Sequence, residues 1–347
     1  MTKTLLPEWA PQTFVELAWP HAATDWAPCL EEACRCFEAI VRAVVSCGED
    51  VLIVAPDPDA ARHRLGEMPL VHYAECPTND TWTRDTGFLT LSNGEFCDFQ
   101  FNGWGLKFAA CDDNRINARI FTALTGLFYG SSDVRPVYRD CLRTVLEGGS
   151  IESDGRGTLL TTSSCLLAPN RNGFGSKEEA SQMLCSALGA QRVLWLDHGH
   201  LEGDDTDGHI DTLARLCPDD TILYIRCDNP ADAHYDDLRA MEQQLRSFRT
   251  LDGRPYRLLP LPMADVVRDE SGQRLPATYA NYLVINGAVL LPSYNRPHND
   301  NEAARQLRTA FPSREIISVD CQVLIRQHGS LHCSTMQFPR LQDIPPK

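Results

Sequence analysis

The sequence lacks long apolar runs. No stretch among its 347 residues approaches the ~18 uninterrupted apolar residues that a membrane-spanning helix needs. The first residues, MTKTLLPEWAPQTF, also lack the basic start and the apolar run of a signal peptide. We therefore expect a soluble, cytoplasmic protein that does not bind a membrane.

The sequence also lacks paired cysteines. Its 14 cysteines stand singly between Cys29 and Cys333, and none shows the CxxC spacing of a structural zinc site. Their density is too low for a small disulfide scaffold. We expect most of these thiols to be reduced and buried as small apolar side chains.

Positive charge is scarce. The 47 acidic residues outnumber the 32 basic ones, which gives a formal net charge of −15. Such a field repels nucleic acid and anionic membranes and attracts cationic ligands at low salt. Solubility alone would explain the same excess, so the charge indicates a partner only together with a binding site.

No Ser/Gly-rich linker or block of charge divides the chain, so we expect one closed domain over residues 1–347. An amphipathic helix followed by a short apolar strand recurs five times. The pairs cover residues 29–55, 112–139, 177–196, 233–262 and 301–319. The repetition is structural and carries no sequence identity.

Hairpin signals lie between these helix–strand pairs. Asn-Gly separates two apolar or alternating runs in residues 87–101 and 281–294, and Asp-Gly does so in residues 150–162. The pattern predicts an α/β fold of five β-rich modules, each with one main helix.

One polar cluster follows the repeated strand of each module. The clusters are NDTWTRDTG (79–87), LEGGSIES (146–153), DDTDGHIDT (204–212), ATYANY (277–282) and SLHCST (330–335). Five loops or strand ends that each carry polar groups are expected to converge on a shared centre.

Asp85 and Glu147 are ambiguous when taken alone. Asp85 lies between Trp82 and Gly87, a pattern that fits a turn in which the carboxylate caps a backbone amide. Glu147 precedes a glycine pair that would let the backbone come close to a ligand. Neither cluster indicates an active site without the others.

His209 has more informative surroundings. Asp204, Asp205, Asp207 and Asp211 flank it, and several carboxylates around one imidazole favour the protonated ring. In an extended run His209 and Asp211 would point to the same side. A metal site is the alternative, but it would need further His or Cys ligands at suitable spacing.

Cys333 stands in a run that is too polar for a simple core cysteine. Its neighbour His332 would face the other way if the run were a strand. We therefore expect the reacting histidine to be His209.

Together these groups suit a guanidinium. Asp85 and Asp211 can each accept hydrogen bonds from its planar fork, which leaves the central carbon open to attack by a Cys333 thiolate. His209 can protonate the leaving ammonia and later activate water, while Glu147 orients the imidazole. The product is a urea, and the reaction needs neither a metal nor an organic cofactor.

At these positions the chain resembles the agmatine deiminases, within a larger guanidino-modifying family that includes arginine deiminases and bacterial peptidylarginine deiminases. The matching stretches run in family order: PTNDTWTRDTG, FNGWG, LEGGSIESDGRGTLLTTSSCLL, PNRN, DDTDGHIDTLAR, YANYLVINGAVLLPSYN and QHGSLHCSTMQFP. The resemblance implies a closed five-bladed α/β propeller (the pentein fold) of ββαβ modules around a central site.

The resemblance also implies residue roles. Those of the reacting groups are an amidino thioether at Cys333, acid/base chemistry at His209, guanidinium ligands at Asp85 and Asp211, and a partner for His209 at Glu147. Further contacts to the substrate are implied for Trp82 and Asp205, and Asn281 is expected to shape the site.

The far end of the substrate is less well defined. Relatives often have a more glycine-rich lead into the cysteine than QHGSLHC, and often another residue than Thr86. A free-arginine enzyme would need a basic residue for the substrate carboxylate, and Arg84, Arg171 and Arg326 are the candidates. The excess of acid around His209 instead favours agmatine, which lacks the carboxylate and would yield N-carbamoylputrescine for polyamine synthesis.

Three alternatives stay open. A protein-arginine deiminase would share the fold, although such relatives usually carry secretion signals and extra domains. An amidino transferase would pass the group to an amine. A non-catalytic binding protein on the same propeller would have no reason to keep a thiol, an imidazole and carboxylates together. The sequence is compatible with a homo-oligomer but does not give the oligomeric state.

Overall fold

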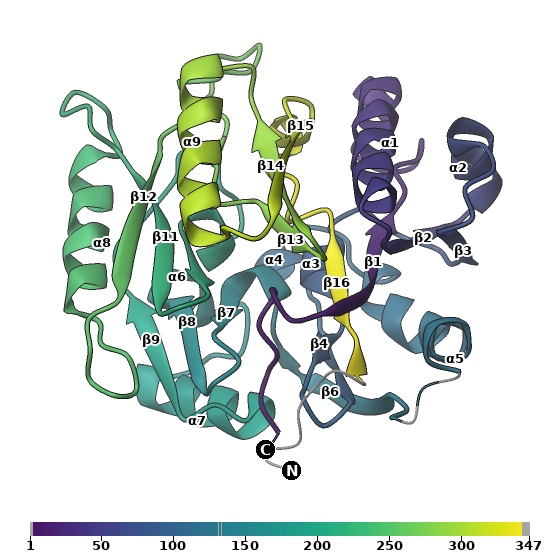
Figure 1. Cartoon of the computed structure of the whole chain (residues 1–347), viewed down its shortest axis with the longest axis horizontal. Coiled ribbons are helices and arrows are strands. Elements are labelled where there is room, and N and C mark those ends of the chain that lie inside the picture. Colours follow the sequence, from purple (N-terminus) through teal and green to yellow (C-terminus); the bar gives the residue numbers. More distant parts are fainter. Residues whose placement is uncertain (1–2, 131, 133, 342–347) are drawn as a thin grey trace.

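The computed structural model describes residues 3–130, 132 and 134–341, and its strands form five sheets (Figure 1). The first sheet has the order β16-β1-β2-β3, and the other four have three strands each. The strands of the first two sheets are β1 (Gln12–Ala18), β2 (Asp50–Ala55), β3 (Val71–Glu75), β16 (Met336–Pro339), β4 (Leu89–Thr90), β5 (Glu95–Gln100) and β6 (Val137–Val145). Those of the other three are β7 (Ile151–Ser153), β8 (Thr158–Thr162), β9 (Arg192–Leu196), β10 (Ala214–Cys217), β11 (Thr221–Arg226), β12 (Arg257–Pro262), β13 (Leu283–Ile285), β14 (Ala288–Ser293) and β15 (Glu315–Asp320).

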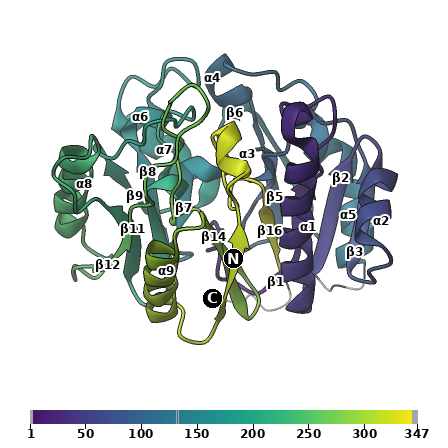
Figure 2. The ribbon, with the colours of Figure 1, turned by 90° about the horizontal axis from the view of Figure 1, so that it is seen from above.

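Each module combines an antiparallel pair with a parallel strand that the chain reaches through a helix. The crossover helices are α1 (Leu30–Ser46), α5 (Ile116–Tyr129), α7 (Lys177–Leu188), α8 (Tyr235–Ser247) and α9 (Pro297–Ala310), and α2 (Pro58–Leu65) leads to the extra strand β3. Helices α1, α2, α8 and α9 lie at the periphery in the view from above (Figure 2). The five predicted helix–strand pairs and the α/β class are confirmed.

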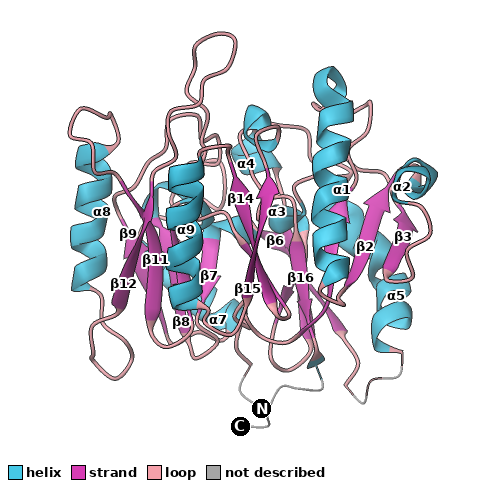
Figure 3. Cartoon of the chain, turned by 45° about the horizontal axis from the view of Figure 1, so that its top comes forward, coloured by secondary structure: helices cyan, strands magenta, loops and turns pink. Residues whose placement is uncertain are grey.

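The last strand completes the first module. β16 pairs antiparallel with β1, which in turn pairs parallel with β2. Figure 3 shows β16 on the same side of the molecule as β2 and β3, which belong to the same sheet. Five sheets with this closure are consistent with a five-bladed propeller.

The three hairpins with Asn-Gly or Asp-Gly turns form as predicted. A fourth hairpin, β10–β11, carries no such signal. Its turn contains Asp219 and Asp220 with φ of 56° and 53°, the left-handed conformation that type I′ turns require. Asp tolerates this conformation better than most residues, so the turn forms without glycine.

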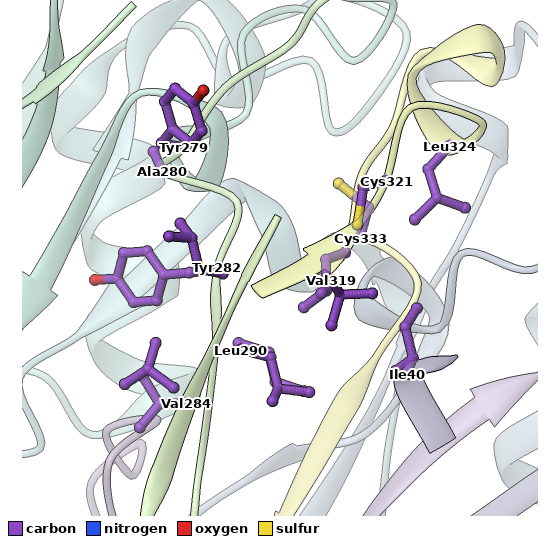
Figure 4. Close-up of a cluster of buried hydrophobic side chains, with 14 of the residues drawn as sticks. Ile40, Tyr279, Ala280, Tyr282, Val284, Leu290, Val319, Cys321, Leu324 and Cys333 are labelled. Atoms are coloured by element: carbon purple, nitrogen blue, oxygen red, sulfur yellow. The ribbon is translucent and has the colours of Figure 1, made fainter. Parts of the chain in front are cut away.

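The apolar faces of the modules meet in two hydrophobic clusters among the described residues. In α1 the predicted face of Cys34, Phe37, Val41 and Val44 is buried, and Leu30 is partly exposed. Cys333 belongs to the same core cluster as Tyr282, Leu290 and Cys321 (Figure 4).

All 14 cysteines are free thiols, and Cys111 is the exposed one. Within the described residues, no helix combines the length and the apolar character needed to cross a membrane.

Candidate active site

A pocket of about 530 Å³ collects most of the predicted site residues. Its buried end is formed by Asp85, His209 and Cys333, whose exposed fractions are 5%, 1% and 7%. We call the carboxylates Asp25, Asp80 and Asp205, which line the same pocket and are more accessible, its exposed end. Trp82, Trp104 and Phe108 also line the pocket, whereas Glu147, Asp211 and Asn281 lie behind its wall.

Short helical turns, and not strand ends, carry the reacting groups. Asp85 lies in the four-residue helix α3 (Thr83–Thr86), and Glu147 precedes the 3-10 turn η3 (Gly148–Ser150). His209 precedes another 3-10 turn, η4 (Ile210–Thr212), which contains Asp211. The prediction of an extended run around His209 is therefore wrong, although the side chains of His209 and Asp211 both reach the site.

Asp85 is fixed by two hydrogen bonds. Its Oδ2 accepts from Trp104 Nε1 at 2.8 Å, and its Oδ1 accepts from the Gly149 amide at 2.8 Å. Burial raises the pKa of Asp85, while the charge of His209 works in the opposite direction. The carboxylate is thus held rigidly in a place where a cation would stabilise its charged form.

Gly149 lies at the centre of the site. A Cβ atom at this position would come within 2.7 Å of His209 Nδ1, 2.8 Å of Asp85 Oδ1 and 3.1 Å of Asp211 Oδ2. The backbone at Gly149 thus comes close to three side chains of the site, while its predicted approach to a ligand stays a prediction.

His209 lies between two carboxylates. Its Nδ1 is 3.6 Å from Asp85 Oδ1, and its Nε2 is 3.6 Å from Glu147 Oε2. Burial works to lower the pKa of His209, but the charge of Asp85, the Cys165 sulfur and Glu147 together raise it well above its ordinary value. Nε2 faces the Glu147 carboxylate, whereas Nδ1 faces Asp85, which lines the pocket.

Glu147 is held from behind by an arginine that the sequence placed in another role. Both Glu147 oxygens accept from Arg171 Nε, at 3.0 and 2.8 Å, and both side chains are fully buried. Arg171 Nη1 donates to Asp207 Oδ2 at 2.6 Å, and Nη2 donates to the Thr206 carbonyl at 2.8 Å. The pKa of Glu147 is lowered because His209 and Arg171 outweigh the effect of burial.

Asn281 connects the Cys333 thiol to Asp211. Its Nδ2 lies 3.2 Å from both Cys333 Sγ and Asp211 Oδ2, and its Oδ1 accepts from the Cys333 amide at 3.2 Å. Cys333 Sγ is 3.8 Å from Asp211 Oδ2. Burial and the charges of Asp211 and Asp85 raise the pKa of the Cys333 thiol well above its ordinary value.

His332 does not face away from the site. Residues 331–334 form a turn before β16, and His332 Nδ1 lies 2.8 Å from Asp211 Oδ2. The sequence-based dismissal of His332 assumed a strand and is wrong. No pattern in the sequence distinguishes it, except its place beside Cys333.

The exposed end is acidic and aromatic. Burial and the charge of Asp25 raise the pKa of Asp80 to about 6, and burial together with Asp204 raises that of Asp205 to about 6. Trp82 packs against Trp26, with ring centroids 5.7 Å apart, and a Cβ atom at Gly329 would come within 2.3 Å of the Trp82 ring.

The three candidate arginines do not reach this pocket. Arg84 is buried and lies against the His332 carbonyl and Met336, Arg171 is taken up by Glu147, and Arg326 pairs with Glu32 at 2.6 Å. Among the described residues, the pocket lining includes no lysine or arginine.

Two groups of side chains have the spacing for a metal ion, namely Glu147–Cys165–His209 and Glu8–Glu152–His332. In each, a guanidinium already contacts the carboxylates: Arg171 on Glu147, and Arg215 on Glu8 and Glu152. Neither group includes any of the aspartates that flank His209 in the sequence. The carboxylates of both groups are instead paired with arginine.

The family model described as "Porphyromonas-type peptidyl-arginine deiminase" matches residues 4–339. The agmatine deiminase of Pseudomonas syringae pv. tomato is 31% identical over 96% of this chain and 94% of its own length.

Solved structures agree in fold over nearly the whole chain. A substrate-bound cysteine-to-serine variant of C. jejuni agmatine deiminase is 36% identical, covers 97% of this chain and 96% of its own, and gives a TM-score of 0.88. A Porphyromonas gingivalis protein described as a provisional arginine deiminase is 48% identical, covers 98% and 99%, and gives a TM-score of 0.89.

Proposed function

We propose that this chain, which belongs to the family of Porphyromonas-type peptidyl-arginine deiminases, is an agmatine deiminase. It hydrolyses the guanidinium of agmatine to N-carbamoylputrescine and ammonia, a step of putrescine and polyamine synthesis. The similarity to agmatine deiminases over most of the chain supports this assignment. The pocket supplies the chemistry.

The guanidinium binds at the buried end of the pocket. Asp85 lies in the lining, and Asp211 keeps its Oδ1 without a hydrogen-bond partner among the described residues. Two carboxylates can accept the paired N–H groups of the planar cation from two sides. The cation also offsets the negative charges that raise the pKa of the Cys333 thiol, so its binding promotes loss of the thiol proton to solvent.

The first step forms a bond between Cys333 Sγ and the guanidinium carbon. His209, which the neighbouring carboxylates keep protonated, gives its proton to the departing nitrogen. The C–N bond breaks, ammonia leaves, and an amidino thioether remains on Cys333. Glu147 stabilises the imidazolium from the other side, at 3.6 Å.

The second step hydrolyses the thioether. His209 takes a proton from a water molecule, and the resulting hydroxide adds to the amidino carbon. The C–S bond then breaks, the proton of the added hydroxyl passes to solvent, and the urea and the Cys333 thiolate are released. Asn281 donates to the sulfur at 3.2 Å and can stabilise the thiolate in both steps.

The acidic lining at both ends of the pocket is the observation that carries the choice of substrate. Asp25, Asp80 and Asp205 form the exposed end, and the described lining offers no lysine or arginine to a carboxylate. Agmatine has an ammonium group four methylenes from its guanidinium, whereas free arginine carries a carboxylate beside its ammonium group, and this carboxylate would meet the acidic lining. Trp82 and Asp205 are thus assigned to the aminobutyl end of the substrate.

Free arginine and peptidylarginine are the competing substrates, given the family description and the P. gingivalis relative. The test measures ammonia release by the purified protein from agmatine, arginine and an arginine-containing peptide, with Cys333→Ser as the control. We expect agmatine to be used at least about 100-fold more efficiently. Turnover of arginine or peptide without turnover of agmatine would contradict the proposal, and an unchanged rate in Cys333→Ser would exclude the covalent step. Acceptor-dependent turnover with little hydrolysis would indicate a transferase.

The cytoplasmic location and a homo-oligomeric state stay predictions. Cell fractionation and light scattering of the purified protein would check them.

A further inference from the structure

A second group of charged side chains lies buried behind the pocket. It consists of Glu8, Arg84, Glu152, Arg215 and His332, and each has an exposed fraction of 9% or less. Glu8 belongs to the segment before β1, so the N-terminal and C-terminal parts of the chain both contribute to this group. None of its members enters the chemistry described above.

His332 connects this group to the active site. Its Nδ1 lies 2.8 Å from Asp211 Oδ2, and its Nε2 lies 2.8 Å from Glu8 Oε2. In each protonation state that fits the Asp211 contact, Nδ1 donates to that carboxylate. His332 Nε2 also lies 3.0 Å from Arg215 Nη2, so Glu8 and Arg215 together hold this nitrogen.

Glu8 is itself firmly placed. Its Oε2 accepts from Arg215, and its Oε1 accepts from the Val284 amide at 2.6 Å. Arg215 also bonds Glu152 and donates to the carbonyls of Ala280 and Tyr282, at 3.0 and 2.8 Å. The backbone at 280–284 thus fixes Arg215, Arg215 fixes Glu8, and Glu8 faces His332.

The contacts to Asp211 are one-sided. His332 and Asn281 both donate to Oδ2, whereas Oδ1 is buried without a partner among the described residues. A buried carboxylate oxygen without a hydrogen bond is destabilising, so a ligand that donates to it is favoured. The side chains behind the pocket therefore determine which Asp211 oxygen is left for the guanidinium.

The charges around Glu8 keep it in the carboxylate form. Arg215 and His332 lower the pKa of Glu8 against the effect of burial.

We propose that Glu8 and His332 are positioning residues for the reaction, because Glu8 holds His332 and His332 holds Asp211 with one oxygen open to the guanidinium. The effect on turnover rests on the proposed function. The effect on the Cys333 thiol does not, since Asp211 Oδ2 itself lies 3.8 Å from the sulfur.

The test compares Glu8→Gln with Glu152→Gln. Both substitutions remove a buried carboxylate that pairs with Arg215, but Glu152 bonds Arg215 and the Leu216 amide and makes no hydrogen bond to His332 among the described contacts. Glu8→Asp and His332→Gln are the second pair of variants. Three quantities are measured in each: the melting temperature, kcat and KM with agmatine, and the pH dependence of Cys333 alkylation by iodoacetamide.

We expect the two Glu→Gln variants to lose similar thermal stability. Glu8→Gln and His332→Gln should lower kcat/KM about 10- to 100-fold and move the alkylation profile to higher pH, because Asp211 Oδ2, next to the sulfur, loses a firmly held hydrogen-bond donor. Glu8→Asp should recover part of the activity, and Glu152→Gln should stay within about threefold of the unchanged protein.

Equal effects of Glu8→Gln and Glu152→Gln on kcat/KM and on the alkylation profile would overturn the proposal and leave a purely structural role. If Glu8→Gln fails to fold, the same comparison between His332→Gln and Glu152→Gln decides. If the unchanged protein uses none of the guanidino compounds, the proposed function fails, and the alkylation profiles still test whether Glu8 and His332 act on the site.

Discussion

The two ends of the pocket carry the same functional group in different settings. At the buried end, Asp85 has both oxygens hydrogen-bonded, and Glu147 and Asp211 are held from behind by Arg171 and His332. At the exposed end, Asp25 is solvent-exposed, and Asp80 and Asp205 have pKa values raised to about 6.

The difference matches two tasks. Chemistry at the guanidinium carbon depends on reacting groups held in place, because a displacement of about 1 Å can cost about 100-fold in rate. Attraction of an ammonium group requires charge more than geometry, so accessible and weakly fixed carboxylates suffice. Changes at the buried end should therefore affect kcat, and changes at the exposed end should affect KM.

The largest effect is expected from Gly149→Ala. The added Cβ would come within 2.8 Å of both His209 Nδ1 and Asp85 Oδ1, so the two side chains must separate. We expect kcat to fall by at least about 100-fold. Gly126→Ala is the control, because Gly126 lies in α5 with no atom within 4 Å of the new Cβ. Activity in Gly149→Ala close to that of Gly126→Ala would refute a rigid buried end.

Arg171→Gln should give the next largest change. It leaves Glu147 as a fully buried carboxylate without its cation, and loss of one partner of such a pair costs about 3–5 kcal/mol. We expect a large drop in melting temperature and a fall in kcat of about 10- to 100-fold.

Two further variants sharpen this result. Arg171→Lys keeps the charge but not the planar fork, so it should recover stability better than kcat. Arg326→Gln removes an arginine that is 50% exposed and pairs with Glu32. It should lower the free energy of unfolding by no more than about 1 kcal/mol and leave kcat unchanged. Equal behaviour of the Arg171 and Arg326 variants would contradict the positioning of Glu147.

Asp205→Asn tests the exposed end. A charge-assisted hydrogen bond contributes about 1.5–3 kcal/mol, so KM for agmatine should rise about 10-fold or more while kcat changes little. With n-butylguanidine, which lacks the second cation, KM should not change. A similar increase for both compounds would show that Asp205 does not meet the ammonium group.

Acidic pH should weaken binding at the same end. A carboxylate whose pKa is raised to about 6 is charged above that pH and neutral below it, as for Asp80 and Asp205. KM for agmatine should therefore increase several-fold as the pH falls from about 7 to 5. Steady-state kinetics in Asp205→Asn should show a smaller increase, and an identical one would assign the effect to another group.

The smallest effect is expected from Asp25→Asn. Asp25 lines the pocket but is solvent-exposed, and an exposed charge contributes about 0–1 kcal/mol to an ion pair. KM for agmatine should rise less than about fivefold at low salt and not at all at high salt. A salt-independent rise in KM as large as that of Asp205→Asn would show that Asp25 contributes to agmatine binding as much as Asp205 does.

Local sequence patterns were sufficient for the parts of the fold that depend on local physics. Apolar periodicity gave the five helix–strand pairs, and Asn-Gly or Asp-Gly gave three of the hairpins. The β10–β11 turn escaped because Asp219 and Asp220 adopt positive φ without glycine.

The reacting residues were accessible to chemical reasoning, and the residues that hold them were not. A thiol, an imidazole and carboxylates indicate chemistry wherever they stand. Arg171 and His332 were assigned other positions because their partners, Glu147 and Asp211, are distant in sequence. Glu8 and His332 are separated by 324 positions, and no local pattern reports such a contact.

The pairing of β16 with β1 also orders events during synthesis of the protein. Cys333 and β16 leave the ribosome after all the other modules, and β1 has no antiparallel partner until they do. Closing so long a loop carries an entropic cost that later contacts must recover. Because the sulfur arrives on the same segment that completes the sheet of β1, a nascent chain holds no reactive site, and enzymatic activity reports that folding is complete.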